Sequence, residues 1–244
     1  MAATNVFNGQ KKMTDSNLRV SEIFYSLQGE GTNAGRPVVF LRTSHCNLAC
    51  TWCDTKYTWD WDNYDYLTEV KEMSIEDLIN SISRYQSKHL VITGGEPMIQ
   101  QKQLLHLIRK VKEMGYFIEI ETNGTILPDR YLDDLVDQWN VSPKLESSLI
   151  ERSAREIEKC YLFFTNHSKC YFKYVINDSR DLQELQDLVK KYRIRANRII
   201  LIPQGKDKNE IIARGKWLSE ICKAKGYILS LRLQILLWSN RRGV

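Results

Sequence analysis

Cys46-Asn-Leu-Ala-Cys50-Thr-Trp-Cys53 places three of the six cysteines of this 244-residue chain in one short loop. Three thiolates at this spacing can bind one inorganic cluster or one metal ion. A closed structural zinc site needs four protein ligands, and the loop supplies three. An iron–sulfur cube bound by three cysteines keeps one iron open for a small molecule, whereas electron-transfer clusters use four. The spacing therefore favours a reactive cluster; the alternatives are a zinc knuckle completed by His45 or a distant ligand, and three unrelated buried thiols.

The composition limits the class of protein. Hydrophobic residues make up 43% and charged residues 27%, and the net charge is +5 from 35 basic and 30 acidic residues. This modest, scattered charge is more typical of a solvated surface than of a nucleic-acid-binding stripe. No apolar stretch is long enough to cross a bilayer, and the N-terminus lacks the apolar core of a signal peptide. We expect a cytoplasmic protein without membrane or nucleic-acid partners.

The length suits one large α/β domain, which we place at residues 18–244 after a disordered N-terminus at 1–17. Six cysteines in a cytoplasmic chain favour a metal site over disulfides. Cys160, Cys170 and Cys222 lie far apart in amphipathic or apolar stretches. Because free cysteines often pack as small hydrophobic residues, we predict that these three are buried packing residues.

Short apolar runs alternate with helical patterns along the chain. The runs lie at residues 38–42, 90–93, 117–122, 139–141, 171–176 and 199–202. Between them, apolar residues recur at intervals of three and four, as at 104–111 and 182–189, and Ser74 caps a further predicted helix. Such alternation predicts parallel strands joined by right-handed crossovers. About six strands are too few for a closed eight-stranded barrel, so we expect a partial parallel β/α barrel or an open sheet.

Glycine, proline and polar residues directly follow several of these runs. Gly94-Gly95-Glu96-Pro97 ends one strand, and Ser142-Pro143-Lys144 ends another. Two adjacent glycines allow a backbone to approach a ligand closely. Since ligands bind at the carboxyl ends of parallel strands, we expect both segments to share one mouth with the cysteine loop.

The cysteine loop and the Gly94–Pro97 turn together resemble the radical S-adenosylmethionine superfamily. Over about residues 20–244 the resemblance narrows to the 7-carboxy-7-deazaguanine synthases. It rests on the segments 26–31, 35–37, 40–42, 53–55, 121–124, 142–144 and 237–244. Enzymes of that family rearrange 6-carboxy-5,6,7,8-tetrahydropterin into 7-carboxy-7-deazaguanine with loss of ammonia, on the route to queuosine and other 7-deazapurines.

The resemblance implies three cofactors: a [4Fe–4S] cluster, S-adenosylmethionine and Mg²⁺. The cluster would be held by Cys46, Cys50 and Cys53. The hydroxyl of Thr55 would bind Mg²⁺, which completes its shell with substrate and water. S-adenosylmethionine would contact Trp52, Gly95, Glu96, Ser142, Pro143 and Lys144. Its cleavage at the reduced cluster would yield the radical that removes a hydrogen atom from C6 of the pterin, and ring contraction would follow.

The pterin would contact six further residues, according to the same resemblance: Leu27, Gln28, Gly29, Arg42, Thr93 and Val244. Arg42 would grip the substrate carboxylate through two parallel hydrogen bonds. Its alternative partners are Glu30 and solvent.

The C-terminal segment departs from one branch of the family, because it lacks that branch's glutamine and histidine–lysine residues. Either the terminal carboxylate of Val244 completes the site, or Leu236, Leu237 and Trp238 form a dimer seam and Arg241 and Arg242 are solvated.

Partners and alternative functions follow from the same comparison. The resemblance implies an electron donor such as flavodoxin or ferredoxin, and a homodimer. Trp59, Trp61, Tyr64 and Tyr66 either cover the site or pack beneath a neighbour. The first alternative function is another radical enzyme, such as an activase that makes a glycyl radical on a partner protein. The second is a noncatalytic zinc or RNA-binding module, for which the sequence offers neither a fourth clustered ligand nor a dense basic stripe.

Overall fold

The computed structural model describes residues 17–239 and 241–244, so the expectation of a disordered N-terminus lies, except for Asn17, outside the described residues. Within them, nine strands form one sheet in the order β3-β1-β2-β4-β5-β6-β7-β8-β9. The six expected strands are all present and mutually parallel: β2 (Pro37–Thr43), β4 (His89–Gly94), β5 (Phe117–Thr122), β6 (Gln138–Val141), β7 (Cys170–Ile176) and β8 (Ile199–Pro203). The expected partial β/α barrel is therefore confirmed.

Three further strands extend the sheet at its edges. β1 (Leu18–Leu27) pairs antiparallel with β2, and β3 (Lys71–Met73) pairs antiparallel with β1. β9 (Ile228–Leu229) adds a short parallel strand beside β8. None of the three was predicted, because β1 is mostly half-buried and lacks a long apolar run, and the other two span only two or three residues.

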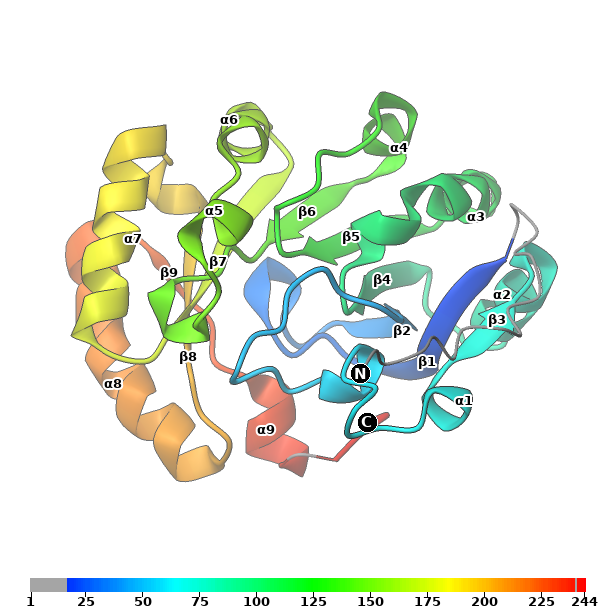
Figure 1. The fold of residues 1–244 in the computed structure, drawn as a ribbon, viewed down its shortest axis with the longest axis horizontal. Coiled ribbons are helices and arrows are strands. Elements are labelled where there is room, and N and C mark those ends of the chain that lie inside the picture. Colours follow the sequence, from blue (N-terminus) through cyan, green and yellow to red (C-terminus); the bar gives the residue numbers. More distant parts are fainter. Residues whose placement is uncertain (1–16, 240) are drawn as a thin grey trace, which may run out of the picture.

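Helices cover the outer face of the curved sheet, as Figure 1 shows. They are α2 (Ile75–Ile82), α3 (Gln101–Glu113), α4 (Arg130–Leu135), α6 (Glu158–Asn166), α7 (Ser179–Tyr192) and α8 (Lys208–Lys225). Ser74 caps α2 as predicted, since its hydroxyl accepts a hydrogen bond from the Asp77 amide at 3.1 Å. Three short helices, α1 (Tyr66–Glu69), α5 (Arg152–Arg155) and α9 (Leu233–Trp238), lie elsewhere. No helix in the described ranges is long and apolar enough to span a membrane.

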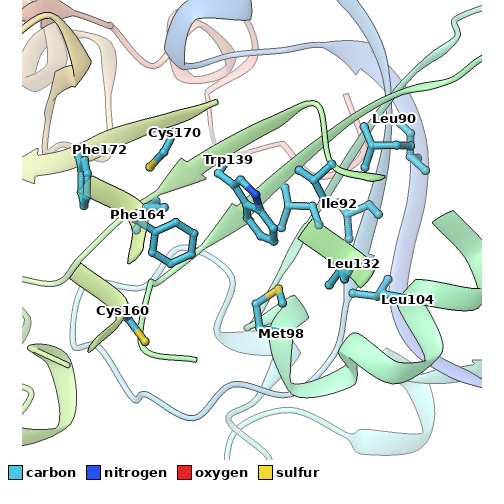
Figure 2. Close-up of a cluster of buried hydrophobic side chains, with 14 of the residues drawn as sticks. Leu90, Ile92, Met98, Leu104, Leu132, Trp139, Cys160, Phe164, Cys170 and Phe172 are labelled. Carbon is cyan, nitrogen blue, oxygen red and sulfur yellow. The ribbon is translucent and has the colours of Figure 1, made fainter. Parts of the chain in front are cut away.

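The hydrophobic core lies between the sheet and these outer helices (Figure 2). Ile92 of β4 and Trp139 of β6 are fully buried there, and Phe164 of α6 stacks edge-on against Trp139 at 5.6 Å. Cys160 and Cys170 belong to the same cluster, and so does Cys222. The prediction that these three cysteines are packing residues is confirmed.

The inner face of the sheet carries buried charged side chains beside a small apolar cluster of Val38, Phe40 and Val91. On β5, Ile118 and Ile120 join the core, whereas Glu119 and Glu121 project to the opposite face because side chains alternate along a strand. Buried Lys173 of β7 occupies the same inner face. The barrel interior therefore contains buried charged groups, and the site lies at its open end.

Candidate active site

The end of β4 packs directly on the start of the cysteine loop. The Gly95 amide donates to the Thr43 carbonyl at 3.1 Å, and the Glu96 amide donates to the His45 carbonyl at 2.8 Å. A Cβ atom on Gly94 would overlap the backbone of Thr43, and one on Gly95 would overlap that of His45. Both glycines are thus required by backbone packing, whatever ligand they also contact.

The other side of the cysteine loop packs on the segment that follows β6. The Trp52 indole N–H donates to the Ser147 carbonyl at 3.0 Å. The Lys144 ammonium lies 5.4 Å from the centre of the Trp52 ring and donates to the Ser142 hydroxyl at 3.1 Å. The structure therefore brings together three of the residues predicted to contact S-adenosylmethionine, next to the cysteines.

All three predicted cluster ligands line one cavity of about 560 Å³. Burial raises the pKa of Cys46 to about 12 and also raises that of Cys50, although the nearby Lys144 charge opposes the second shift. Cys53 Sγ accepts a hydrogen bond from the Trp59 indole at 3.4 Å and lies 3.6 Å from the Thr55 hydroxyl. The thiols thus share a cavity of ordinary ligand size.

The arrangement fits a cluster better than a single ion. Among residues 17–239 and 241–244, no three His, Cys, Asp or Glu side chains converge to hold one metal ion. A [4Fe–4S] cube binds each thiolate through a separate iron, so its ligands need not converge on a point. His45 cannot complete a zinc knuckle in this geometry, because its two ring nitrogens lie 3.0 Å from Arg19 and 2.9 Å from the Ser44 hydroxyl.

Arg42 lies on the cavity wall at the end of β2. Its Nε donates to Glu22 Oε2 at 2.8 Å, and its guanidinium lies 5.7 Å from the Phe24 ring centre. Tyr57 donates to the same Glu22 oxygen at 2.8 Å. The alternative prediction that Arg42 pairs with Glu30 was wrong. The carboxylate that faces Arg42 is Glu22, which comes from β1, a strand that was not predicted from the sequence.

Glu30 instead belongs to a second charged group in the same cavity. Lys173 lies 3.1 Å from Glu30 and 2.8 Å from Glu121, and Arg232 lies 3.2 Å from Glu30. Burial would raise the pKa of Glu30, but Lys173 and Arg232 outweigh it and lower that pKa to about 2. Thr93, a predicted pterin contact, donates to Glu121 at 2.9 Å.

Sequence analysis missed Glu121, Lys173 and Arg232 as cavity residues. A usable signal existed for two of them: Glu121 and Lys173 interrupt apolar strands at positions that face the barrel interior. No comparable signal marked Arg232.

The predicted pterin loop is held from two directions. Gln28 is buried, and its amide donates to Glu119 at 2.8 Å. The Gly29 carbonyl accepts from the Leu233 amide of α9 at 3.0 Å, and a Cβ atom on Gly29 would overlap the Gln234 side chain. Gly29 therefore allows α9 to pack against the loop.

Most of the other predicted residues line the same cavity. The full set of predicted residues there is Leu27, Gln28, Gly29, Arg42, Cys46, Cys50, Trp52, Cys53, Thr55, Thr93, Gly95, Ser142, Lys144 and Val244. Glu96 and Pro143 are not among the described residues of its wall. Glu96 is buried and accepts from Thr122 at 2.7 Å and from the Asn123 amide at 2.6 Å, so it fixes the turn after β5.

The aromatic residues between 57 and 66 divide between the two predicted roles. Trp59 lines the cavity. Trp61 and Tyr66 pack on the His45 ring, with centroids at 5.6 and 5.8 Å, and Tyr64 packs edge-on against Tyr57 at 6.3 Å. Of Trp59, Trp61, Tyr64 and Tyr66, only Trp59 therefore covers the cavity, and the other three pack beneath neighbouring residues.

A partial β/α barrel with three clustered cysteines at its mouth defines a radical S-adenosylmethionine enzyme. The family model described as the Radical SAM superfamily matches residues 40–203, and the chain belongs to that superfamily. Family membership implies a [4Fe–4S] cluster and S-adenosylmethionine, and the cysteine arrangement fits the cluster.

Similar proteins identify the family more closely. A 7-carboxy-7-deazaguanine synthase from Pyrobaculum aerophilum is 36% identical over 93% of this chain and 97% of its own length. One from Rhodopirellula baltica is 33% identical over 96% and 92%. The crystal structure of QueE from Escherichia coli matches with a TM-score of 0.68 and 28% identity, covering 89% of this chain and 94% of that one. The chain belongs to the 7-carboxy-7-deazaguanine synthase family, which confirms the resemblance seen in the sequence.

Proposed function

We propose that this enzyme rearranges 6-carboxy-5,6,7,8-tetrahydropterin into 7-carboxy-7-deazaguanine with loss of ammonia. The observation that carries the proposal is a single cavity lined by three thiols, by Arg42 and by the loop at Leu27–Gly29. The names of the similar proteins support the same reaction. A cavity of about 560 Å³ suits a small-molecule substrate.

Cys46, Cys50 and Cys53 would hold the cluster, and Trp52, Ser142 and Lys144 would hold S-adenosylmethionine beside it. When bound, these cofactors supply the radical chemistry that breaks a carbon–hydrogen bond. The protein's task is to orient the substrate carbon toward them and to keep water out. Lys144 contributes a positive charge that suits the carboxylate of S-adenosylmethionine.

Arg42 would bind the substrate carboxylate. Its Nε is held by Glu22, and within the described ranges that is the one hydrogen bond of the guanidinium. The terminal nitrogens of a side chain on the cavity wall are then available to a ligand carboxylate, which a guanidinium binds strongly.

The charge balance of the cavity supports an anionic substrate. Eight basic side chains line it: Arg42, Lys56, Lys144, Lys173, Lys206, Arg232, Arg241 and Arg242. Four acidic side chains oppose them: Glu22, Glu30, Asp54 and Glu121. An excess of positive charge on a concave wall favours binding of a carboxylate.

Magnesium belongs to the same proposal. Thr55 lines the cavity and would give its hydroxyl to the ion, while substrate and water oxygens complete the shell. The bound ion would neutralise and orient the substrate carboxylate. Omission of Mg²⁺ should slow the wild type and should matter less for Thr55→Ala, which has lost the ligand; full activity of both proteins in chelator would contradict the assignment.

The proposal also includes a cytoplasmic enzyme that receives electrons from a donor such as flavodoxin or ferredoxin and forms a homodimer. Leu237 of α9, with 54% of its surface exposed, is a candidate residue for the dimer contact. Light scattering of the purified protein measures the oligomeric state directly.

The decisive experiment is turnover by anaerobically reconstituted protein. Iron and sulfide analysis establishes loading, and mass spectrometry follows the pterin, 7-carboxy-7-deazaguanine and 5′-deoxyadenosine. We expect product from the wild type and none from Cys50→Ala. Loaded protein that cleaves S-adenosylmethionine but leaves the pterin unchanged would show that the reaction is a different one.

A further inference from the structure

The segment after α9 is tied to the opposite side of the cavity by one arginine. Both terminal nitrogens of Arg242 contact Glu69 of α1, at 3.1 and 2.8 Å, and its Nε contacts Glu22 of β1 at 3.1 Å. The guanidinium also lies 3.6 Å from the centre of the Tyr57 ring. Arg242 was expected to be solvated; 44% of its side chain is exposed, yet every nitrogen of its fork also has a partner, so it is both solvated and anchored.

Glu22 connects this arginine to the substrate side of the cavity. Its Oε1 accepts from Arg242, and its Oε2 accepts from Arg42 and Tyr57. Burial would raise the pKa of Glu22, but its positive and hydroxyl partners outweigh burial and lower it, so the carboxylate stays charged. One ionised group therefore holds an arginine of the C-terminal segment and the arginine proposed to bind substrate.

The segment that Arg242 anchors forms part of the cavity wall. Ser239, Arg241, Gly243 and Val244 all line the cavity, together with Gln234 and Ile235 of α9. In Figure 1, α9 and the C-terminus, drawn in red, lie near the segment that carries the cysteines. The anchor therefore holds part of the cavity wall in place.

We propose that Arg242 is a positioning residue: it fastens the C-terminal segment across the cavity through Glu69 and fixes Glu22, which in turn orients Arg42 toward the substrate carboxylate. The part that concerns substrate rests on the function proposed above. The anchoring through Glu69 and Glu22 is independent of it. Arg242 itself need not touch the substrate; it acts through Glu22 and through the part of the wall that it holds.

The proposal predicts a selective effect on substrate. Arg242→Ala removes a two-point ion pair and frees Glu22 to move, so the KM for the pterin should rise by about tenfold, the effect of one charge-assisted hydrogen bond. Affinity for S-adenosylmethionine should change less than about twofold, because its predicted contacts lie on the cysteine loop, on the turn after β4 and on the segment after β6, and none of them bonds to Arg242, Glu22 or Glu69. Arg242→Lys should recover part of the loss, since lysine offers a point charge without the fork.

The test uses reconstituted holoenzyme in four forms besides wild type: Arg242→Ala, Arg242→Lys, Glu69→Gln and the control Arg180→Ala. Glu69→Gln weakens the anchor without touching Glu22 or Arg42, and it stands in if Arg242→Ala does not fold. Arg180 makes a comparable two-point pair with Asp178 but is 88% exposed. The readouts are KM and kcat for the pterin, S-adenosylmethionine affinity, and amide hydrogen exchange of α9 and the residues after it.

We expect Arg242→Ala and, to a smaller extent, Glu69→Gln to raise the KM and to speed exchange in the C-terminal segment, with Arg180→Ala unchanged. Equal losses for pterin and S-adenosylmethionine, or an unchanged KM, would overturn the positioning role. Exchange rates equal to wild type would overturn the anchor itself. If wild type does not convert the pterin, the proposed function fails, and the exchange measurement still decides the anchor because it needs no substrate.

Discussion

Individual side chains set the properties of the cluster loop. Of the three thiols, Cys53 is the one whose sulfur lies 3.4 Å from an indole nitrogen, that of Trp59. Hydrogen bonds to a ligand sulfur stabilise the more negative, reduced state of an iron–sulfur cluster and so raise its reduction potential. The Leu48 amide makes a similar contact to Cys46 Sγ at 3.5 Å, but Trp59 is the donor that a substitution can remove, so we expect it to adjust the cluster without binding it.

Trp59→Phe tests this role because it keeps the ring and removes the donor. We expect the cluster of the variant to have a more negative reduction potential than that of wild type, measured by electron paramagnetic resonance at a series of fixed potentials. Trp61→Phe is the matched control, since Trp61 packs on His45 instead. Equal potentials in the Trp59 variant and wild type would show that the N–H makes no difference to the cluster.

The two groups of cysteines should behave differently on substitution. Cys46→Ala, Cys50→Ala and Cys53→Ala should each lose most of the bound iron, because each would remove one of the three proposed ligands. Cys160→Ala should keep its iron and lose stability, because Cys160 is buried in the core. Iron per chain and thermal unfolding measure both effects; loss of the cluster from Cys160→Ala alone would reverse the assignment.

Secondary-structure elements depend on glycine in two distinct ways. At Gly95 the place of a Cβ atom is occupied by the backbone of His45, so no second substitution could make room for a side chain there. At Gly29 the space is occupied by the Gln234 side chain of α9, which can be shortened. The second case allows the packing of α9 to be tested by paired substitutions.

Gly29→Ala should destabilise the protein by about 1–3 kcal/mol, the usual cost of overpacking. Gln234→Ala alone loses a hydrogen bond to Glu30. In the double variant the shortened side chain leaves room for the new methyl group. The double variant should therefore lose less unfolding free energy than the two single variants lose together. Urea unfolding of the four proteins gives the coupling energy, and strict additivity would mean that α9 does not pack on Gly29 in solution.

Some strands of the sheet can be predicted from the sequence and others cannot. Runs such as 90–93 are recognisable because both faces of a central parallel strand are apolar or nearly so. β1 is not recognisable in this way, because it is an edge-side strand with half-buried residues, and its Glu22 looks like a surface carboxylate. The partner of Arg42 could not be predicted for the same reason: the pairing of β1 with β2 is set by tertiary structure.

Across the whole molecule, the charged groups buried in the barrel interior tie stability to pH. Lys173 and Arg232 lower the pKa of Glu30 to about 2 against burial, from an ordinary value of 4.5. A lowered carboxyl pKa stabilises the folded state above the unfolded value and loses that contribution as pH falls through the folded one. The window is therefore about pH 4.5 down to about 2.

Glu30→Gln should remove this pH dependence. Ionised Glu30 stabilises the folded state above pH 4.5, because Lys173 and Arg232 lower its pKa, and the neutral glutamine lacks that contribution. The free energy of unfolding of wild type should thus exceed that of the variant above pH 4.5, and the two curves should approach one another toward pH 2. Urea unfolding across this range checks the prediction, and a constant difference at every pH would contradict it.

The cavity wall joins parts of the chain that are made at very different times. Gln234 donates to Glu30 at 3.0 Å across 204 residues of sequence. A ribosome adds about 5–20 residues per second, so roughly 10–40 s separate these two partners during synthesis. From β2 to β9, apart from the edge strand β3, each strand pairs with the one made before it. The sheet behind the cysteines can therefore form before α9 is made, and α9 with the residues after it completes the cavity wall last.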